Sequence, residues 1–228
     1  LVTLRANPPP SQMVLQDGTI HVLPPVTHDM LRIETELLLD WYWPAVRGVG
    51  CPDDVRQDFN DLWDRVFVRL DQEPKGWLLR DYHSPNLIAL DDRAPPRDVG
   101  IIDFQDALLG PHAYDLVSLL QDARLDVPQD IEADLLAHYI ARVKSIDPAF
   151  DDQAFRFAYA ALGAQRNTKI LGIFARLAKR DGKRQYLAHI PRIWRYLTRD
   201  LDHVEMASLA SWYDRHFPAE GRNRPLQI

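Results

Sequence analysis

The segment Leu79-Arg80-Asp81-Tyr82-His83-Ser84-Pro85-Asn86-Leu87 decides how the rest of the chain is interpreted. It places an aspartate and an asparagine five positions apart in a polar loop between two short apolar runs, so both side chains can converge on one site. A second segment, residues 101–106, ends another apolar run on Asp103. Together the two segments supply a carboxylate that can orient and deprotonate a hydroxyl, and Asn and Asp oxygens that can hold Mg²⁺. Phosphoryl transfer needs this set.

Each of these residues also has a structural interpretation. Asp81 and Asn86 can be turn residues that bond their own backbone, and Asp103 can cap a strand. The combination is more specific, because Asp-x-x-x-x-Asn between strands, followed by two apolar residues and Asp-Phe, matches kinase-like enzymes. A metallohydrolase site made by His83 with Asp81, Asp103 and Asp106 is the chemical alternative. No further histidine lies close in sequence to support it.

Upstream of this loop the pattern predicts a hairpin and helices. The proline run 8–10 ends a helix over Leu1–Leu4, because proline lacks a backbone donor. Asp17-Gly18 between two apolar runs predicts a hairpin. Thr27 is a helix N-cap, and Pro44 limits the helix that follows. The predicted elements are strands at 13–15 and 20–22, helices at 27–44 and 52–70, and short strands at 77–79, 87–90 and 99–102.

Downstream of Tyr114 the apolar spacing is helical to the end of the chain. The predicted helices cover residues 115–125, 129–145, 151–178, 184–200 and 203–216. Large aromatic residues at helical spacing are more typical of a core than of a surface that stacks on sugars. This preference concerns Trp41, Tyr42, Trp43, Trp194 and Trp212. The expected fold class is therefore α+β and mostly helical, with a small β insert around the polar loop.

Composition excludes several classes of function. The chain has 228 residues, 46% of them hydrophobic and 26% charged, which is typical of a folded globular protein. A net charge of -6 gives no general attraction to nucleic acid or anionic membranes. No apolar run reaches the roughly 20 residues of a bilayer span, and residues 1–20 show no secretion signal. We expect a cytoplasmic protein without nucleic-acid or membrane partners.

The sequence resembles the aminoglycoside-phosphotransferase-like kinases. Within them it is most similar to the bacterial cell-wall amino-sugar kinases, which phosphorylate N-acetylmuramate and N-acetylglucosamine at the anomeric position. Residues 78–87, 102–111 and 114–123 carry the resemblance, with weaker similarity at 36–42 and 165–172. It implies the C-terminal lobe of a protein-kinase-like fold that uses ATP as phosphate donor, Mg²⁺ as cofactor and a small sugar as acceptor.

The same resemblance implies roles for individual residues. Asp81 would be the catalytic base, and Asn86 and Asp103 would bind the Mg²⁺ of the nucleotide complex. Arg80, His83 and Asp115 would support the site, although Asp115 can equally be the N-cap of the helix that follows it. Two further residues, Asp40 and Arg166, are candidates for binding the acceptor, with solvated helix surface as the alternative for each.

Two departures from the family pattern bear on domain organisation. Leu79 stands where the family often has a histidine, whose role is usually structural. No lysine precedes Lys75, and the close glycine pair Gly48-x-Gly50 lacks the third glycine of a phosphate loop. We therefore expect one domain over residues 1–228, with a hairpin and helices over 1–76, catalytic and metal loops over 77–106 and helices over 107–228.

On this interpretation the N-terminal nucleotide lobe is absent and belongs to a longer chain. These residues alone would then be inactive. Two alternatives remain open: a non-catalytic kinase-like binding module, and a phosphotransferase that acts on an aminoglycoside antibiotic.

Overall fold

The computed structural model describes residues 1–222 and 226, and their packing forms two compact units. The first, called the loop unit here, comprises Leu1–Val26 and Glu73–Ala158. The second, the helical unit, comprises Thr27–Gln72 and the chain from Tyr159 onward. Whether the two units behave as the single predicted domain stays a prediction.

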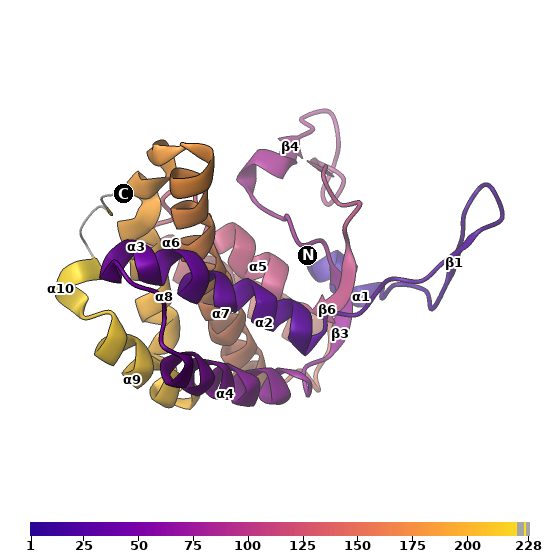
Figure 1. The fold of residues 1–228 in the computed structure, drawn as a ribbon. Helices are drawn as coiled ribbons and strands as arrows, with labels where there is room; N and C mark the ends of the chain where they lie inside the picture. Colours follow the sequence, from indigo (N-terminus) through magenta and orange to yellow (C-terminus); the bar gives the residue numbers. More distant parts are fainter. Residues whose placement is uncertain (223–225, 227–228) are drawn as a thin grey trace. The chain divides into compact units, whose positions relative to one another are not determined.

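The described strands of the loop unit form two-stranded antiparallel sheets (Figure 1). The pairs are β1 (Met13–Val14) with β2 (Ile20–His21), β3 (Lys75–Leu78) with β6 (Leu108–Pro111), and β4 (Leu87–Ala89) with β5 (Val99–Ile101). The first pair is the predicted hairpin. Its turn is closed by Asp17, whose Oδ1 accepts from the Thr19 amide at 2.9 Å, and by Gly18 at φ 83°.

Strand β6 has no counterpart in the sequence prediction. It pairs with β3 in a register that sets Leu78 opposite Leu108 and Gly76 opposite Gly110. A Cβ atom on Gly110 would lie 2.5 Å from the Leu78 Cδ1, so a side chain at this position would require the Leu78 side chain to move. Four residues that include a glycine and a proline carry too little alternation to predict a strand.

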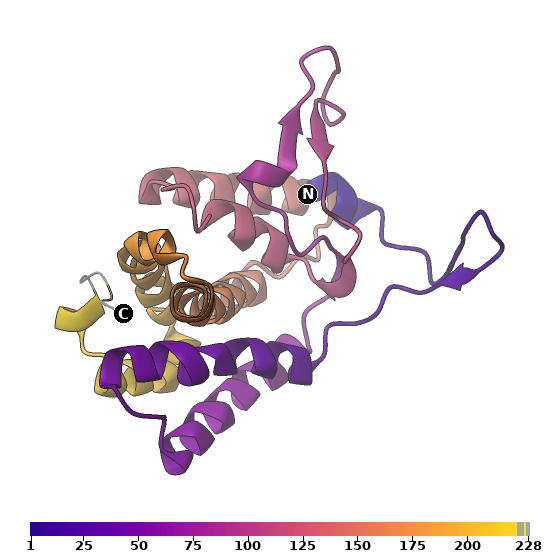
Figure 2. The same ribbon diagram turned by 45° about the horizontal axis from the view of Figure 1, so that its top comes forward.

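Figure 2 shows the two hairpins of the loop unit, β1–β2 and β4–β5, extending away from its helices. Helix α1 contacts β3 and α6, where the Trp77 Nε1 donates to the Asn7 carbonyl at 3.0 Å. The Arg5 guanidinium lies 4.8 Å from the centre of the Phe150 ring. The elements are α1 (Val2–Ala6), the 3₁₀ turn η2 (Ser84–Asn86), α5 (Ala113–Leu120), α6 (Gln129–Ile146) and the first turns of α7 (Asp152–Asp181).

The helical unit contains the rest of α7 and the remaining described helices. They are α2 (His28–Leu37), the π turn η1 (Leu38–Tyr42), α3 (Trp43–Arg47), α4 (Asp53–Leu70), the 3₁₀ turns η3 (Arg184–His189) and η4 (Val204–Met206), α8 (Ile190–Leu201), α9 (Ala207–His216) and α10 (Ala219–Arg222). Thr27 caps α2 as predicted, because its Oγ1 accepts from the Met30 amide at 3.2 Å. The mostly helical α+β class is confirmed.

The predicted end of the first long helix at Pro44 is wrong. Pro44 lies in the first turn of α3, where a residue without an amide donor is tolerated, and the helix continues to Arg47. The π turn η1 joins α2 to α3 and accommodates the change of hydrogen-bonding pattern between them. Gly48, at φ 74°, is the left-handed cap that ends α3, so the Gly48-x-Gly50 pair belongs to a helix terminus and its loop.

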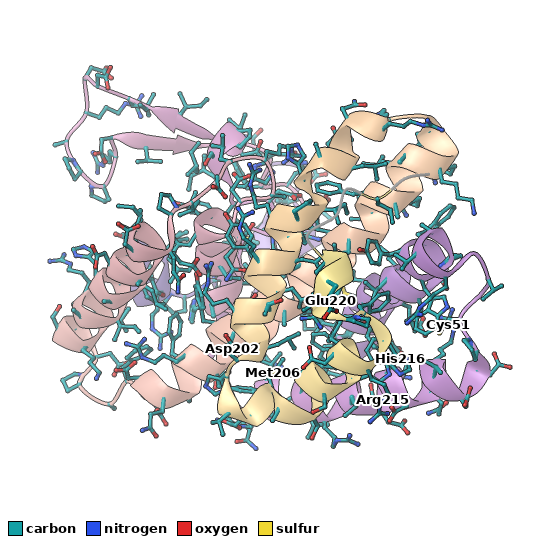
Figure 3. The ribbon with its side chains drawn as sticks, turned by 90° about the vertical axis from the view of Figure 1, so that its left-hand side faces the viewer. Cys51, Asp202, Met206, Arg215, His216 and Glu220 are labelled. Carbon is teal, nitrogen blue, oxygen red and sulfur yellow. The ribbon has the colours of Figure 1, made fainter. Side chains whose placement is uncertain are left out.

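Aromatic side chains form the core of the helical unit. Trp194 donates from Nε1 to the Tyr42 hydroxyl at 2.8 Å, and the Phe59 and Trp212 rings lie 4.6 Å apart. Figure 3 labels Met206 and His216 near the two ends of α9, the helix that carries Trp212. The core interpretation is therefore confirmed for Tyr42, Trp43, Trp194 and Trp212, which are all buried, while Trp41 is half-buried.

Gly172 sets the distance between α7 and α2 within the helical unit. A Cβ atom at this position would lie 2.3 Å from the backbone carbon and oxygen of Leu37, which cannot move as a flexible side chain would. We expect Gly172→Ala to lower the free energy of unfolding by about 2–3 kcal/mol, measured by urea denaturation. Gly50→Ala is the matched control, because nothing lies within 4 Å of its Cβ position. Equal stability of the two variants would contradict this expectation.

None of the helices in residues 1–222 is both long enough and apolar enough to span a bilayer. The cytoplasmic location stays a prediction.

Candidate functional site

The loop that carries Asp81 and Asn86 runs between two strands of different sheets. Strand β3 ends at Leu78, the polar residues follow, and the 3₁₀ turn Ser84–Asn86 leads directly into β4. Asp103 follows β5, the partner of β4, with only Ile102 between them. Because the amide of Ile102 donates to the Asn86 carbonyl at 3.1 Å, the pairing of β4 with β5 brings the second predicted segment to the first.

Asn86 connects the other two predicted site residues, Asp81 and Asp103, through one amide nitrogen. Its Nδ2 donates to the Asp81 carbonyl at 2.9 Å and to the Asp103 Oδ2 at 3.3 Å. The Asn86 Oδ1 accepts from none of the described residues. The side chain is 9% exposed, so its orientation is fixed by these bonds. The amide oxygen is left as a neutral acceptor next to the Asp103 carboxylate.

Asp103 adopts a backbone conformation that non-glycine residues rarely use. Its φ is 63°, in the left-handed region, and its side chain is exposed. The Gln105 Nε2 donates to the Asp103 Oδ1 at 2.8 Å, while Asn86 holds the other oxygen. The strained residue therefore presents its carboxylate in an orientation set by two amide groups.

Asp81 is exposed, and its carboxylate accepts no hydrogen bond from the described residues. Its backbone is held closely, because its amide donates to the Leu79 carbonyl at 2.8 Å and its carbonyl accepts from the His83 amide at 3.0 Å. A fixed main chain with an unpaired carboxylate leaves both oxygens available to a molecule in solution.

Asp115 holds the start of the loop from inside α5. Its two carboxylate oxygens accept from the backbone amides of Leu79 at 2.7 Å and Arg80 at 3.0 Å. Arg80 has φ 72°, the other described non-glycine residue in the left-handed region, and these bonds oppose that strain. The N-cap of α5 is His112, so the N-cap alternative for Asp115 is wrong.

Burial raises the pKa of Asp115 to about 6, although the hydrogen bonds from the Leu79 and Arg80 amides lower it. Desolvation outweighs the hydrogen bonds because the carboxylate is 2% exposed. A carboxyl whose pKa is raised on folding adds stability that is complete below the unfolded pKa, near 3.8, and is lost as pH rises through about 6.

This pKa predicts how Asp115→Asn changes the pH dependence of stability. Asparagine does not titrate, so the stability of the variant relative to the native chain should rise between pH 4 and pH 7, by up to about 3 kcal/mol. Urea denaturation at a series of pH values measures the difference. Asp134→Asn, at an exposed position on α6, should give a flat difference over the same range. A flat difference for Asp115→Asn as well would mean that its pKa is not raised.

Two contacts of the loop are not predicted by the local pattern. Gln105 lies two residues after Asp103 but carries no motif signal. Asp122, which follows α5, is fully buried, and its Oδ2 accepts from the Ser84 amide at 3.1 Å. Asp122 lies two positions after the mostly apolar segment 116–120, and this position is the one signal that indicates a buried carboxylate there.

Of the remaining predicted residues, His83 lies in the same loop as Asp81 and Asn86, whereas Asp40 and Arg166 belong to the helical unit. His83 precedes the 3₁₀ turn and is half-buried. Asp40 belongs to the helical unit and accepts from the Arg56 Nη2 at 2.7 Å, and Arg166, also in that unit, is 8% exposed. Acceptor binding by Asp40 and Arg166 stays a prediction.

The donor set of the cluster fits Mg²⁺. The Asn86 Oδ1 and the Asp103 carboxylate are hard oxygen ligands, and Mg²⁺ is usually held by one or two such side chains together with phosphates and water. Within residues 1–222, no group of three or more His, Cys, Asp or Glu side chains is placed to hold a metal ion. The metallohydrolase alternative around His83 and Asp106 therefore gains no support from the geometry.

The chain is similar to N-acetylmuramate/N-acetylglucosamine kinases from Caulobacter vibrioides, with 37% identity over 97% of the chain, and from Pseudomonas aeruginosa, with 35% identity over 77%. A kinase of the same name from Neisseria meningitidis serogroup B is 35% identical over 78% of the chain. The chain spans 60%, 51% and 52% of the length of these three relatives.

A family model described as the phosphotransferase enzyme family matches residues 12–148, which include Asp81, Asn86, Asp103 and Asp115. The match covers more than half of the chain. The chain therefore belongs to the phosphotransferase enzyme family.

Proposed function

We propose that this protein is an ATP-dependent kinase that phosphorylates an amino sugar at its anomeric hydroxyl. The observation that carries the proposal is the cluster of Asp81, Asn86 and Asp103, in which the Asn86 amide is hydrogen-bonded both to the Asp81 backbone and to the Asp103 carboxylate. The names of the relatives, N-acetylmuramate/N-acetylglucosamine kinases, supply the acceptor class. A role in cell-wall recycling follows from that acceptor.

In this mechanism Asp81 orients the acceptor hydroxyl and takes its proton as the oxygen attacks the terminal phosphoryl group of ATP. The anomeric hydroxyl is more acidic than an ordinary alcohol, so a carboxylate is an adequate base. The oxygen–phosphorus bond to the acceptor forms as the bond to ADP breaks, and ADP leaves with that electron pair.

The Asn86 Oδ1 and the Asp103 carboxylate would hold Mg²⁺, which neutralises charge on the phosphates when bound. Asn86 can do this because its Nδ2 is already used on the Asp81 carbonyl and on Asp103, leaving the oxygen free. Asp115 and Arg80 contribute by fixing the backbone from which Asp81 projects.

The proposed reaction also needs a lysine that binds the phosphates of the nucleotide. No lysine precedes Lys75 to bind the α- and β-phosphates, and the relatives are longer than the part matched here. We infer that a segment of the full-length protein supplies the phosphate-binding lysine, and that residues 1–228 alone do not transfer phosphate.

A phosphorylation screen of the full-length protein tests the function. N-acetylmuramate, N-acetylglucosamine and an aminoglycoside are each incubated with ATP and Mg²⁺, and phosphorus NMR identifies the position of the new phosphate. A sugar 1-phosphate supports the proposal, whereas a phosphorylated aminoglycoside supports the antibiotic alternative. Binding of ATP without turnover of any acceptor would support the non-catalytic module and reject the proposal.

A further inference from the structure

Asp122 is a buried carboxylate for which the proposed reaction has no direct use. It follows the C-terminus of α5 and is 0% exposed. Its Oδ1 accepts from the amides of Arg124 at 2.7 Å and Leu125 at 3.3 Å, which folds its own turn. Its Oδ2 accepts from the Ser84 amide at 3.1 Å, 38 positions earlier in the sequence. One oxygen therefore serves the local turn and the other reaches the loop that carries Asn86.

The Ser84 amide needs an acceptor from elsewhere. It is the first donor of the 3₁₀ turn Ser84–Asn86, and the N-cap residue, His83, makes no side-chain cap. Amides at the start of a helical turn have no partner within the turn, so a buried one requires an outside acceptor. Asp122 provides a charged acceptor at this point, and hydrogen bonds to charged groups are the stronger kind.

Asn86 is the last residue of the same turn. The Asn86 amide donates to the His83 carbonyl at 2.9 Å, so the turn is closed between its two ends. A three-residue turn has few internal bonds, and holding its first amide restricts the position of its last residue. The place of the Asn86 side chain thus depends on the bond between Ser84 and Asp122.

Asp122 and Asp115 act on opposite ends of one loop. They lie seven positions apart in the sequence, with Asp115 inside α5 and Asp122 immediately after its C-cap residue, Gln121. Asp115 holds the amides of Leu79 and Arg80 before Asp81, and Asp122 holds the amide of Ser84 after it. With both ends held, neither Asp81 nor Asn86 can shift along the loop independently.

We propose that Asp122 is a positioning residue that keeps the Ser84–Asn86 turn in the geometry that binds a divalent cation. This inference rests on the proposed function, because that function makes Asn86 a metal ligand. The test uses Asp122→Asn and Ser84→Pro, separately and together, in the full-length protein with ADP present. Mn²⁺ is the probe, and its affinity is measured by electron paramagnetic resonance.

Each substitution removes one partner of the hydrogen bond between the Ser84 amide and the Asp122 carboxylate. In Asp122→Asn the new amide side chain keeps an oxygen for the Arg124 and Leu125 amides but presents an NH₂ group to the Ser84 amide. A proline at position 84 has no amide, and His83, at φ -140° and ψ 165°, already has the extended backbone that precedes proline. We expect each variant to bind Mn²⁺ about tenfold more weakly, and the double variant to be no weaker than either one.

Hydrogen exchange without metal gives a second readout. Peptides that cover residues 79–90 should exchange faster in Asp122→Asn, while peptides from α6 and α7 exchange as in the native protein. The matched control is Asp134→Asn, an exposed position on α6 that should change neither measurement. A purely structural role of Asp122 would instead speed exchange throughout the unit.

Several results would overturn the inference. Mn²⁺ affinity within twofold of the native value in both single variants would do so, as would additive effects in the double variant. If Asp122→Asn does not fold, Ser84→Pro alone decides in the same way. Weaker Mn²⁺ binding in a protein that phosphorylates none of the sugars would support the inference and reject only the proposed function.

Discussion

Asp81→Asn should abolish phosphoryl transfer by the full-length protein while leaving its fold unchanged. Asparagine has nearly the same shape but cannot take the proton of the acceptor hydroxyl, and loss of a general base costs about 10²–10⁴ in rate. The Asp81 carboxylate is exposed and bonded to none of the described residues. We therefore expect the free energy of unfolding to change by less than about 0.5 kcal/mol.

Initial rates of sugar phosphorylation and a urea denaturation curve measure the two halves of this prediction. Asp92→Asn is the matched control, because it makes the same change of charge at an exposed position between β4 and β5 and should keep full turnover. Turnover of Asp81→Asn within about tenfold of the native rate would remove Asp81 from the role of base. Loss of activity with an equal loss of stability would assign it a structural role instead.

The sequence is informative about this site where its signals are local. Asp81 and Asn86 are five positions apart, and the strands on either side are marked by short apolar runs, so their place in one loop is predictable. The approach of Asp103 is predictable only through the kinase-like pattern. The approach is created by the pairing of β4 with β5. No residue type in these strands indicates that they pair with each other.

Contacts between residues far apart in the sequence are harder to predict. The family resemblance implies that Asp115 supports the site, while its bonds to Leu79 and Arg80 connect positions 36 and 35 apart. Asp122 is also a buried carboxylate, but the family resemblance implies no role for it. Burial decides its role, and burial of a charged residue after a helix depends on tertiary packing that periodicity does not encode.

In the fold, too, the features set by local backbone chemistry are the predictable ones. The Thr27 cap and the Asp17-Gly18 turn are predictable because both are local backbone chemistry. Pro44 predicts the end of a helix because that is the usual effect of proline in a helix interior. Because a π turn precedes Trp43, α3 has a first turn of its own. Pro44 lies in that first turn, where a residue without an amide donor is tolerated.

Asp103→Asn is expected to have the second-largest effect on activity, through the metal. The substitution removes the negative charge from the pair of oxygen ligands and, in one orientation, sets an NH₂ group against the Asn86 Nδ2, which now donates to Asp103 Oδ2 at 3.3 Å. Charge stabilisation by a bound metal is worth several kcal/mol, so turnover at saturating sugar should fall by about 10²-fold or more. Exposure of the side chain predicts little change in stability.

The dependence of the rate on Mg²⁺ distinguishes this effect from a general loss of activity. In Asp103→Asn, the Mg²⁺ concentration for half-maximal rate should rise, and added Mg²⁺ should recover part of the rate. Gln105 donates to the other Asp103 oxygen at 2.8 Å, so Gln105→Ala removes this hydrogen bond but keeps the Asp103 carboxylate. This variant should raise the Mg²⁺ concentration for half-maximal rate only modestly. An unchanged Mg²⁺ dependence in Asp103→Asn would exclude Asp103 as a ligand. Asn86 would then need a different carboxylate as its partner in the site.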